Sequence, residues 1–293
     1  MNYTVILFYK YVTIADPEAE CKRQRGLCEK YDLTGRLIVA GEGINATLEG
    51  IDGNITAYIE EMKRDERFVD IDFKNSPGTG VSFPKLSVKV RPEIVASSLG
   101  DGVNPKQETG KHISPDTLHR WFESGEDFTV VDMRNDYEVI SGKFTKTRHP
   151  GMHTFREIKE DVEKIKDLKD KKVVAVCTGG IRCEKATGFL KKQGFSDVHQ
   201  LEGGIHRYIE KYPDGYYKGA LYVFDGRMTI DMTDNASDRD IVGKCEFCGN
   251  KTEQYVDDDS TTPSRQLLCC DNCFSKRTDS LRLARKEVAV KQG

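Results

Sequence analysis

Apolar runs alternate with helical patterns over the first 92 residues. YTVILFYKYV reads as a strand, and TGRLIVAGEGINATLEG reads as two strands joined by a Gly-Glu-Gly turn. DPEAECKRQRGLCEKYD begins as a helix should, with Asp16 as N-cap and a proline at the first helical position. GNITAYIEEMKRDERF is a second helix, and VDIDFKNS and KLSVKVRPEIV are further strands. The order β-α-β-β-α-β predicts a ferredoxin-like (acylphosphatase-like) domain over residues 1–92.

A second pattern, in which apolar strands alternate with helices, covers residues 112–218. DFTVVDMR, KVVAVC and SDVHQLEGG are predicted strands, whereas HISPDTLHRWFESG and CEKATGFLKKQG are predicted helices. REIKEDVEKIKDLKDK is predicted to be an exposed helix. This alternation indicates a parallel sheet covered on both faces. Residues 93–111, which are rich in Gly, Ser, Pro and Asn, are predicted to be a linker.

The last part, residues 219–293, contains the cysteine pairs CEFC and CCDNC and then a tail. That tail, FSKRTDSLRLARKEVAVKQG, has six Lys or Arg residues and two acidic ones. It is expected to be a solvated helix or an RNA contact. The chain as a whole is therefore predicted to be an α/β and α+β multidomain protein with a Cys-rich C-terminal segment.

Composition narrows the class of protein. Hydrophobic residues make up 37% and charged residues 32%, which is typical of soluble globular proteins. The formal charge of -3 does not mark the chain as a nucleic-acid binder, so such a role needs a local basic patch. No apolar window has the length of a signal peptide core or a membrane span. We therefore expect a cytoplasmic protein, whose nine cysteines are thiols, metal ligands or catalytic groups rather than disulfides.

The segment KVVAVCTGGIRCEKA places Cys177 between a predicted strand and a predicted helix. Loop amides and a helix N-terminus would converge on its sulfur, which favours the thiolate and lowers its pKa. Arg182 would add positive charge at the rim of the loop. The alternative is that Cys177 is a buried structural thiol. The expected active loop consists of Cys177, Thr178, Gly179, Gly180, Ile181 and Arg182.

Loop length separates two uses of such a cysteine. Cysteine phosphatases need Cys-x5-Arg to surround a tetrahedral phosphate, and the chain has Cys-x4-Arg, which resembles the tighter loop of rhodaneses. VVDMRNDYE resembles the Asp-x-Arg-x-x-x-Glu element of that fold through Asp132, Arg134 and Glu138, which we interpret as structural support. LEGGI resembles its closing strand and turn. Cys183 is either a resolving thiol or a small residue at the start of the helix.

A second cluster of cysteines consists of two CxxC pairs, Cys245 with Cys248 and Cys270 with Cys273. Their spacer is slightly longer than usual for a zinc ribbon, but four thiolates suit tetrahedral zinc. A structural zinc would stabilise a segment that is too polar to form much core. Cys269 is a spare cysteine that could replace a neighbour or do redox work. The alternative is a set of free thiols on a flexible tail.

Longer motifs resemble one family across nearly the whole chain. CTGGIRCEKA, GRLIVAGEGINATLEG, PGTGVSFPKLSVKVRPEIV and CEFCG with CCDNC are similar to the rhodanese-domain tRNA uridine 5-hydroxylases. The resemblance implies 5-hydroxylation of the wobble uridine, position 34, to 5-hydroxyuridine. It implies tRNA, bound at its anticodon loop, as partner. No DNA partner and no membrane partner are expected. It also implies O2 as co-substrate, no organic cofactor, and Cys177 as functional cysteine.

Two other functions remain open at this stage. One is a rhodanese-type sulfurtransferase that carries a persulfide on Cys177. The other is a non-catalytic module that binds RNA or protein. The loop AGEGINA is either a phosphate-binding turn or a plain hairpin. His149, His153 and Arg156 are interpreted as surface polar residues, with acid/base or RNA contacts as the alternative.

Overall fold

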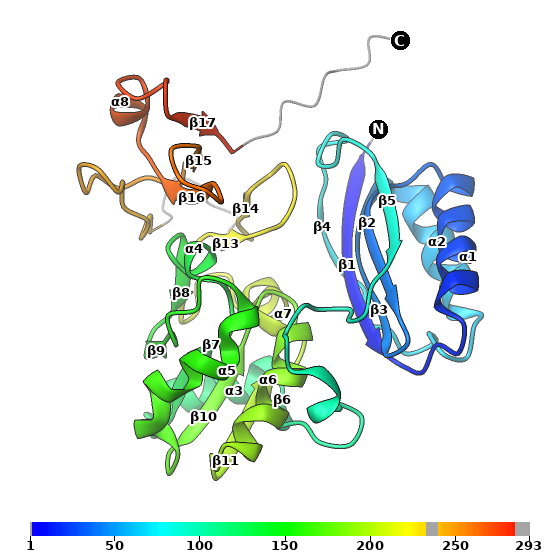
Figure 1. Cartoon of the computed structure of the whole chain (residues 1–293), viewed down its shortest axis with the longest axis horizontal. Coiled ribbons are helices and arrows are strands. Elements are labelled where there is room, and N and C mark those ends of the chain that lie inside the picture. Colours follow the sequence, from blue (N-terminus) through cyan, green and yellow to red (C-terminus); the bar gives the residue numbers. More distant parts are fainter. Residues whose placement is uncertain (1, 233–239, 285–293) are drawn as a thin grey trace. The chain divides into compact units, whose positions relative to one another are not determined.

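The computed structural model describes residues 2–232 and 240–284 of the chain. These residues form two compact units, of which the first ends at Ala96 and the second begins at Ser97 (Figure 1). Among the described residues, no helix combines the length and apolar character needed to cross a bilayer.

The first unit has the predicted ferredoxin-like order of elements. Its sheet has the strand order β4-β1-β3-β2-β5, in which β5 extends the ferredoxin-like arrangement by running parallel to β2. Helices α1 and α2 lie on one face of this sheet (Figure 1). The elements are β1 (Tyr3–Tyr11), α1 (Pro17–Lys30), β2 (Thr34–Ala40), β3 (Gly43–Ile51), α2 (Asp52–Lys63), β4 (Lys74–Pro77) and β5 (Leu86–Val90).

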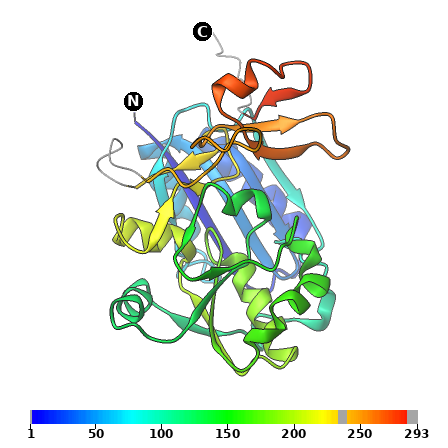
Figure 2. The ribbon, with the colours of Figure 1, turned by 90° about the vertical axis from the view of Figure 1, so that its left-hand side faces the viewer.

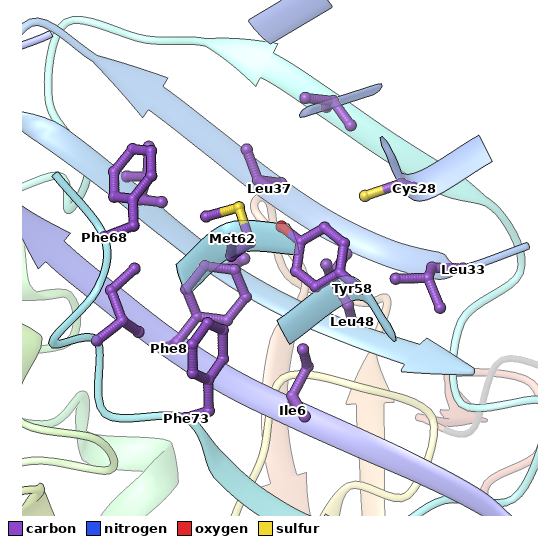
Figure 3. Packing of buried hydrophobic residues seen from close by; sticks show 14 of the residues in the cluster. Ile6, Phe8, Cys28, Leu33, Leu37, Leu48, Tyr58, Met62, Phe68 and Phe73 are labelled. Atoms are coloured by element: carbon purple, nitrogen blue, oxygen red, sulfur yellow. The ribbon is translucent and has the colours of Figure 1, made fainter. Parts of the chain in front are cut away.

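The core of the first unit lies between the sheet and its two helices. Alternate strand residues such as Ile6, Phe8 and Leu37 point toward Tyr58 and Met62 of α2 (Figure 3). Helix α1 begins as predicted, because the Asp16 carboxylate accepts the N–H of Ala19 at 3.0 Å. The AGEGINA segment is the hairpin between β2 and β3.

The second unit contains the predicted parallel sheet. Its strand order is β6-β11-β10-β7-β9, and every neighbouring pair is parallel. The strands are β6 (Lys111–Ile113), β7 (Thr129–Asp132), β9 (Thr147–Arg148), β10 (Lys172–Val176) and β11 (Asp197–Leu201). The helices are α3 (Pro115–Glu123), α4 (Asp136–Val139), α6 (Ile181–Lys192) and α7 (Gly204–Lys211), and a short 3₁₀ turn, η1 (Gly100–Gly102), precedes β6.

The exposed helix predicted over residues 156–171 is wrong. The segment consists of the turns η2 (Phe155–Glu157), α5 (Ile158–Asp161) and η3 (Val162–Leu168), and its backbone leaves helical geometry at Ile165, where φ is -120°. The apolar residues at 162, 165 and 168 are buried. Their spacing of three matches the period of a 3₁₀ helix, so this segment packs as a cover rather than standing in solvent.

The remaining strands carry the cysteine region. A three-stranded sheet with the order β16-β15-β17 packs Tyr255 and Leu268 against Tyr222, with Tyr137 of α4 beside them. Two views of the ribbon place this sheet, in orange and red, beside the green segment that holds α4 (Figures 1 and 2). The elements are β8 (Gly142–Phe144), β12 (Tyr217–Gly219), β13 (Leu221–Tyr222), β14 (Thr229–Ile230), β15 (Tyr255–Asp258), β16 (Arg265–Leu268), α8 (Asp271–Phe274) and β17 (Leu281–Leu283).

Candidate active site

The cysteine loop connects β10 to α6 and closes around the sulfur of Cys177. Gly180 adopts a φ of +101°, which a residue with a side chain rarely tolerates, and its N–H lies 3.2 Å from the Cys177 Sγ. Burial alone would raise the pKa of this thiol. A hydrogen bond from Cys183, the charge of Arg182 and the N–H groups of both residues outweigh burial and lower the pKa of Cys177 below its usual value, to about 6. Cys177 is therefore mainly a thiolate at neutral pH.

Cys183 lies in the first turn of α6 and is fully buried. Burial, together with its hydrogen bond to Cys177, raises the pKa of Cys183 well above its usual value. The pair consequently combines a thiolate with a neighbouring protonated thiol, and both cysteines are free of disulfides.

Arg182 does not lie at the rim of the loop, as the sequence suggested, because only 6% of its surface is exposed. Its guanidinium forms a two-pronged ion pair with Glu138, in which Nη2 donates to Oε2 at 2.9 Å, and Nη2 also donates to the Thr178 hydroxyl at 3.2 Å. A buried, paired guanidinium stabilises the nearby thiolate through its charge and fixes the shape of the loop.

Asp132, Arg134 and Glu138 lie together in one buried network beneath the loop. Arg134 donates from Nη2 to Asp132 at 2.7 Å and to the carbonyl oxygen of Gly142 at 2.7 Å. Glu138 caps α4, where its carboxylate accepts the N–H of Asn135 at 2.9 Å. Glu138 thereby links this network to Arg182. The side chains of Asp132, Arg134 and Glu138 are all fully buried, so we interpret them as residues that support the loop from below.

The start of α7 closes the loop from the other side, a feature that sequence reasoning recognised only as a turn. The N–H of Ile205 donates to the Cys177 carbonyl at 2.9 Å, and the N–H of His206 donates to the Thr178 carbonyl at 3.0 Å. A Cβ on Gly204 would lie 2.6 Å from both the Cys177 oxygen and the Gly180 nitrogen. The paired glycines of LEGGI were the signal for this close approach.

Of the three polar residues singled out between positions 149 and 156, His149 is bonded to the backbone of the network beneath the loop, and the other two lie on the surface. His149 accepts the N–H of Gly151 on Nδ1 at 3.1 Å, so its Nε2 carries the proton that it donates to the Arg134 carbonyl at 2.7 Å. His153 and Arg156 are exposed, and His153 lies 3.2 Å from the Asp136 carboxylate.

The two CxxC pairs converge on one point. The sulfur atoms of Cys245, Cys248, Cys270 and Cys273 all lie within 4.8 Å of one another. Tetrahedral zinc with Zn–S bonds of about 2.3 Å requires sulfur atoms about 3.8 Å apart, so a small inward adjustment would complete such a site. Each pair also sits in a tight turn, as in the Gly249 N–H bond to the Cys245 carbonyl at 2.9 Å. These four residues could therefore hold a metal.

Cys269, the spare cysteine, lies outside this group of four. It is fully buried, and its Sγ approaches the Cys270 carbonyl oxygen at 3.6 Å. The small core beneath the cluster includes Cys269 with Val256 and Leu267. Cys269 thus belongs to the packing of this module, which does form a core of its own.

The fold and the loop define the class of protein. A thiolate at a strand–loop–helix junction of a parallel sheet is typical of rhodanese-like domains, and the family described as Rhodanese-like domain matches residues 114–211. The family described as UPF0176 acylphosphatase like domain matches residues 3–94. The family described as Rhodanase C-terminal matches residues 218–283.

Comparison with full-length relatives narrows this class to one family. The tRNA uridine(34) hydroxylase of Staphylococcus carnosus is 40% identical over 289 residues, covering 93% of this chain and 90% of the relative. That of Oceanobacillus iheyensis is 42% identical over 298 residues, covering 99% and 91%. That of Enterococcus faecalis is 42% identical over 272 residues, covering 92% and 85%. The chain belongs to the tRNA uridine(34) hydroxylase family, which confirms the family expected from the sequence motifs.

Proposed function

We propose that this protein hydroxylates uridine 34 of tRNA at C5, with O2 as co-substrate and Cys177 as nucleophile. The observation that supports it best is the thiolate of Cys177, with a pKa of about 6, in a ring of loop amides. The ring of uracil is electron-poor at C6, and a thiolate is the side chain best suited to add there. The tRNA is proposed to bind through its anticodon loop, in the cytoplasm.

The proposed reaction starts with a covalent adduct. The Cys177 thiolate adds to C6, the electron pair moves to C5, and C5 captures O2 as a hydroperoxide. A thiol then cleaves the O–O bond, which leaves a hydroxyl on C5 and a sulfenic acid on the protein. Loss of the C5 proton and of Cys177 from C6 restores the double bond of 5-hydroxyuridine.

Cys183 is proposed to supply the thiol that cleaves the hydroperoxide. Its sulfenic acid would react with the released Cys177 to give a disulfide and water. The sum is uridine, O2 and two thiols giving 5-hydroxyuridine, water and one disulfide. Each further turnover then requires an external dithiol or glutathione-type reductant to restore the pair.

The activity is tested by nucleoside mass spectrometry of purified tRNA after incubation with the protein and a thiol reductant. One added oxygen on uridine 34, which disappears without O2 and in Cys177→Ala, is the expected result. Unmodified tRNA in every condition would contradict the proposal. Sulfur transfer from Cys177 to a protein thiol would then be the function to test.

The role of Cys183 has a separate test. Without external reductant the reaction should stop after one turnover. Trypsin should then yield the peptide Val173–Arg182 joined by a disulfide to the peptide Cys183–Lys185. Two free thiols after that turnover would show that the electrons come from elsewhere.

We also propose that the four cysteines, Cys245, Cys248, Cys270 and Cys273, bind a structural zinc ion. Thiolate ligands favour zinc, and such a site would stabilise the fold of β15–β17 without taking part in the reaction. Metal analysis of protein purified without chelators should give one zinc per chain. A chain that folds fully with no bound metal would contradict this proposal.

A further inference from the structure

A pocket of about 360 Å³ lies in the second unit, outside the cysteine loop. Its walls come from α4, from the segment between β9 and η2, from β13, and from the sheet that carries the cysteine cluster. Its volume falls in the range of small-molecule sites. The pocket, called here the tyrosine pocket, is lined by Tyr137, His153, Tyr222, Asp257, Ser264, Gln266 and Arg282.

The tyrosine pocket is connected to the active loop through an exposed aromatic residue. The Tyr222 ring lies 5.2 Å from the ring of Phe224, and the Phe224 ring lies 5.8 Å from the Arg182 guanidinium. Phe224 keeps 42% of its surface exposed, so its ring is accessible to a ligand. From the other wall, Tyr137 directly precedes Glu138, the partner of Arg182.

The lining combines flat rings with hydrogen-bonding groups. The rings of Tyr137 and Tyr222 have centroids 5.5 Å apart in an edge-to-face arrangement. The Tyr222 hydroxyl donates to the side-chain Oε1 of Gln266 at 2.7 Å. The side-chain Nε2 of Gln266 donates to no described residue. A ring wall beside amide donors and a carboxylate is the chemistry that binds unstacked bases of single-stranded RNA.

The charges of the tyrosine pocket favour a base over a phosphate. Arg282 is held by Asp257 at 2.9 Å and by Asp259 at 3.2 Å, so two carboxylates neutralise the one guanidinium. A phosphate placed there would face excess negative charge. A neutral ring with amino and carbonyl groups would not.

We propose that the tyrosine pocket binds a nucleobase of the substrate RNA adjacent to the target uridine, and that Phe224 stacks against the RNA between the pocket and the loop. This inference rests on the proposed function and adds a base-binding subsite to it. A base bound in the tyrosine pocket would be separated from the active loop by the rings of Tyr222 and Phe224. Holding this neighbouring base would keep the target uridine unstacked and directed at Cys177.

Binding to a labelled anticodon stem-loop, followed by fluorescence anisotropy, tests the proposal on the full chain. Three RNAs are compared: the intact stem-loop, one abasic at position 33 and one abasic at position 35. Loss of one of these two bases should weaken binding by roughly 5- to 150-fold, the range for loss of one stacked base. Equal binding of all three RNAs by the wild-type protein would overturn the proposal without any variant.

A variant then locates the lost contact. Gln266→Glu keeps the oxygen that accepts from Tyr222 but removes the amide donor, so it should weaken binding of the intact RNA. This variant should also lose little further affinity for the RNA that lacks the base on which wild-type binding depends. Gln107→Glu, which adds the same charge at an exposed position, should behave as wild type. If the loss of affinity from Gln266→Glu and the loss from removing the base multiply in full, the two changes act independently and the base binds elsewhere.

Phe224→Ala should raise the KM for the stem-loop by roughly tenfold and change kcat little, since stacking contributes to binding. Phe247→Ala is the matched control, because Phe247 is also exposed, at 39%, and also contacts an arginine, Arg277. Equal KM values for the two variants would overturn the role of Phe224. Hydroxylation of uridine 34 by the wild type is measured separately, so failure of the subsite is distinguishable from failure of the proposed function.

Discussion

The protonation state of Cys177 is set by its immediate neighbours. Burial opposes the thiolate, and the hydrogen bond from Cys183, the charge of Arg182 and the loop N–H groups favour it. An unfolded chain lacks all of these contacts, so its thiol has a pKa of about 8.5. The folded pKa is therefore depressed relative to the unfolded one. It follows that ionisation of Cys177 stabilises the fold above about pH 8.5 and that this stabilisation disappears as the pH falls through 6.

The ultraviolet absorbance of the thiolate should report this directly. The difference in absorbance between wild type and Cys177→Ser should rise with pH and reach half its maximum near pH 6. The free energy of unfolding lost in Cys177→Ser should be larger at pH 9 than at pH 5. A midpoint near 8.5 would mean that the loop does not stabilise the thiolate.

At the scale of elements, the loop depends on how closely α7 approaches it. The first two N–H groups after Gly204 bind carbonyl oxygens of the loop, and the absence of a side chain at Gly204 lets them do so. The Cys177 loop therefore has two supports, the network of α4 on one side and the backbone of α7 on the other.

Gly204→Ala should disturb the loop far more than a substitution at a comparable glycine. Gly204 and Gly194 both have positive φ, +67° and +86°, but an added Cβ at Gly194 meets no atom within 4 Å. Gly194→Ala should cost about 1–2 kcal/mol of unfolding free energy, from backbone strain alone. Gly204→Ala should cost about 1–3 kcal/mol more, from the clash with the loop. Urea unfolding measures both, and equal costs would contradict the support assigned to α7.

Elements whose signals are local could be predicted from the sequence. The cap at Asp16, the alternation of strands and the junction at Cys177 each depend on neighbouring residues, and the structure has them where the patterns indicated. Features set by distant contacts could not be predicted. The rim position expected of Arg182 failed because Glu138, 44 residues away in sequence, draws its guanidinium inward. The helix expected at 156–171 failed because its apolar residues pack on the rest of the second unit with a period of three.

At the scale of the molecule, the cysteine cluster and the rhodanese-like sheet belong to one unit. The Tyr255 hydroxyl of β15 donates to the Tyr137 carbonyl of α4 at 2.6 Å, and Tyr222 and Leu268 pack around this link. The cluster thus supports a sheet that touches the helix whose Glu138 holds Arg182.

Removal of the proposed zinc should loosen this sheet selectively. After treatment with a strong chelator, amide hydrogen exchange should rise in β15–β17, whereas β10 should stay protected because its core contains none of the four cysteines. Cys248→Ser should produce the same pattern without chelator, since Cys248 is exposed and contributes little else. Unchanged exchange in β15–β17 would show that no metal supports them.

The ion pair of Arg182 and Glu138 has a consequence for inhibitors. Nη1 of Arg182 donates to Glu138, and Nη2 donates to Glu138 and to Thr178, so the charge of the guanidinium is already paired with a buried carboxylate. Vanadate and arsenate are phosphate-like oxyanions, and an arginine binds such anions best when its guanidinium is free to form two parallel hydrogen bonds with them. Because the Arg182 guanidinium already binds a carboxylate in this way, this protein should tolerate such oxyanions at millimolar concentration, while reagents that attack sulfur should inactivate it.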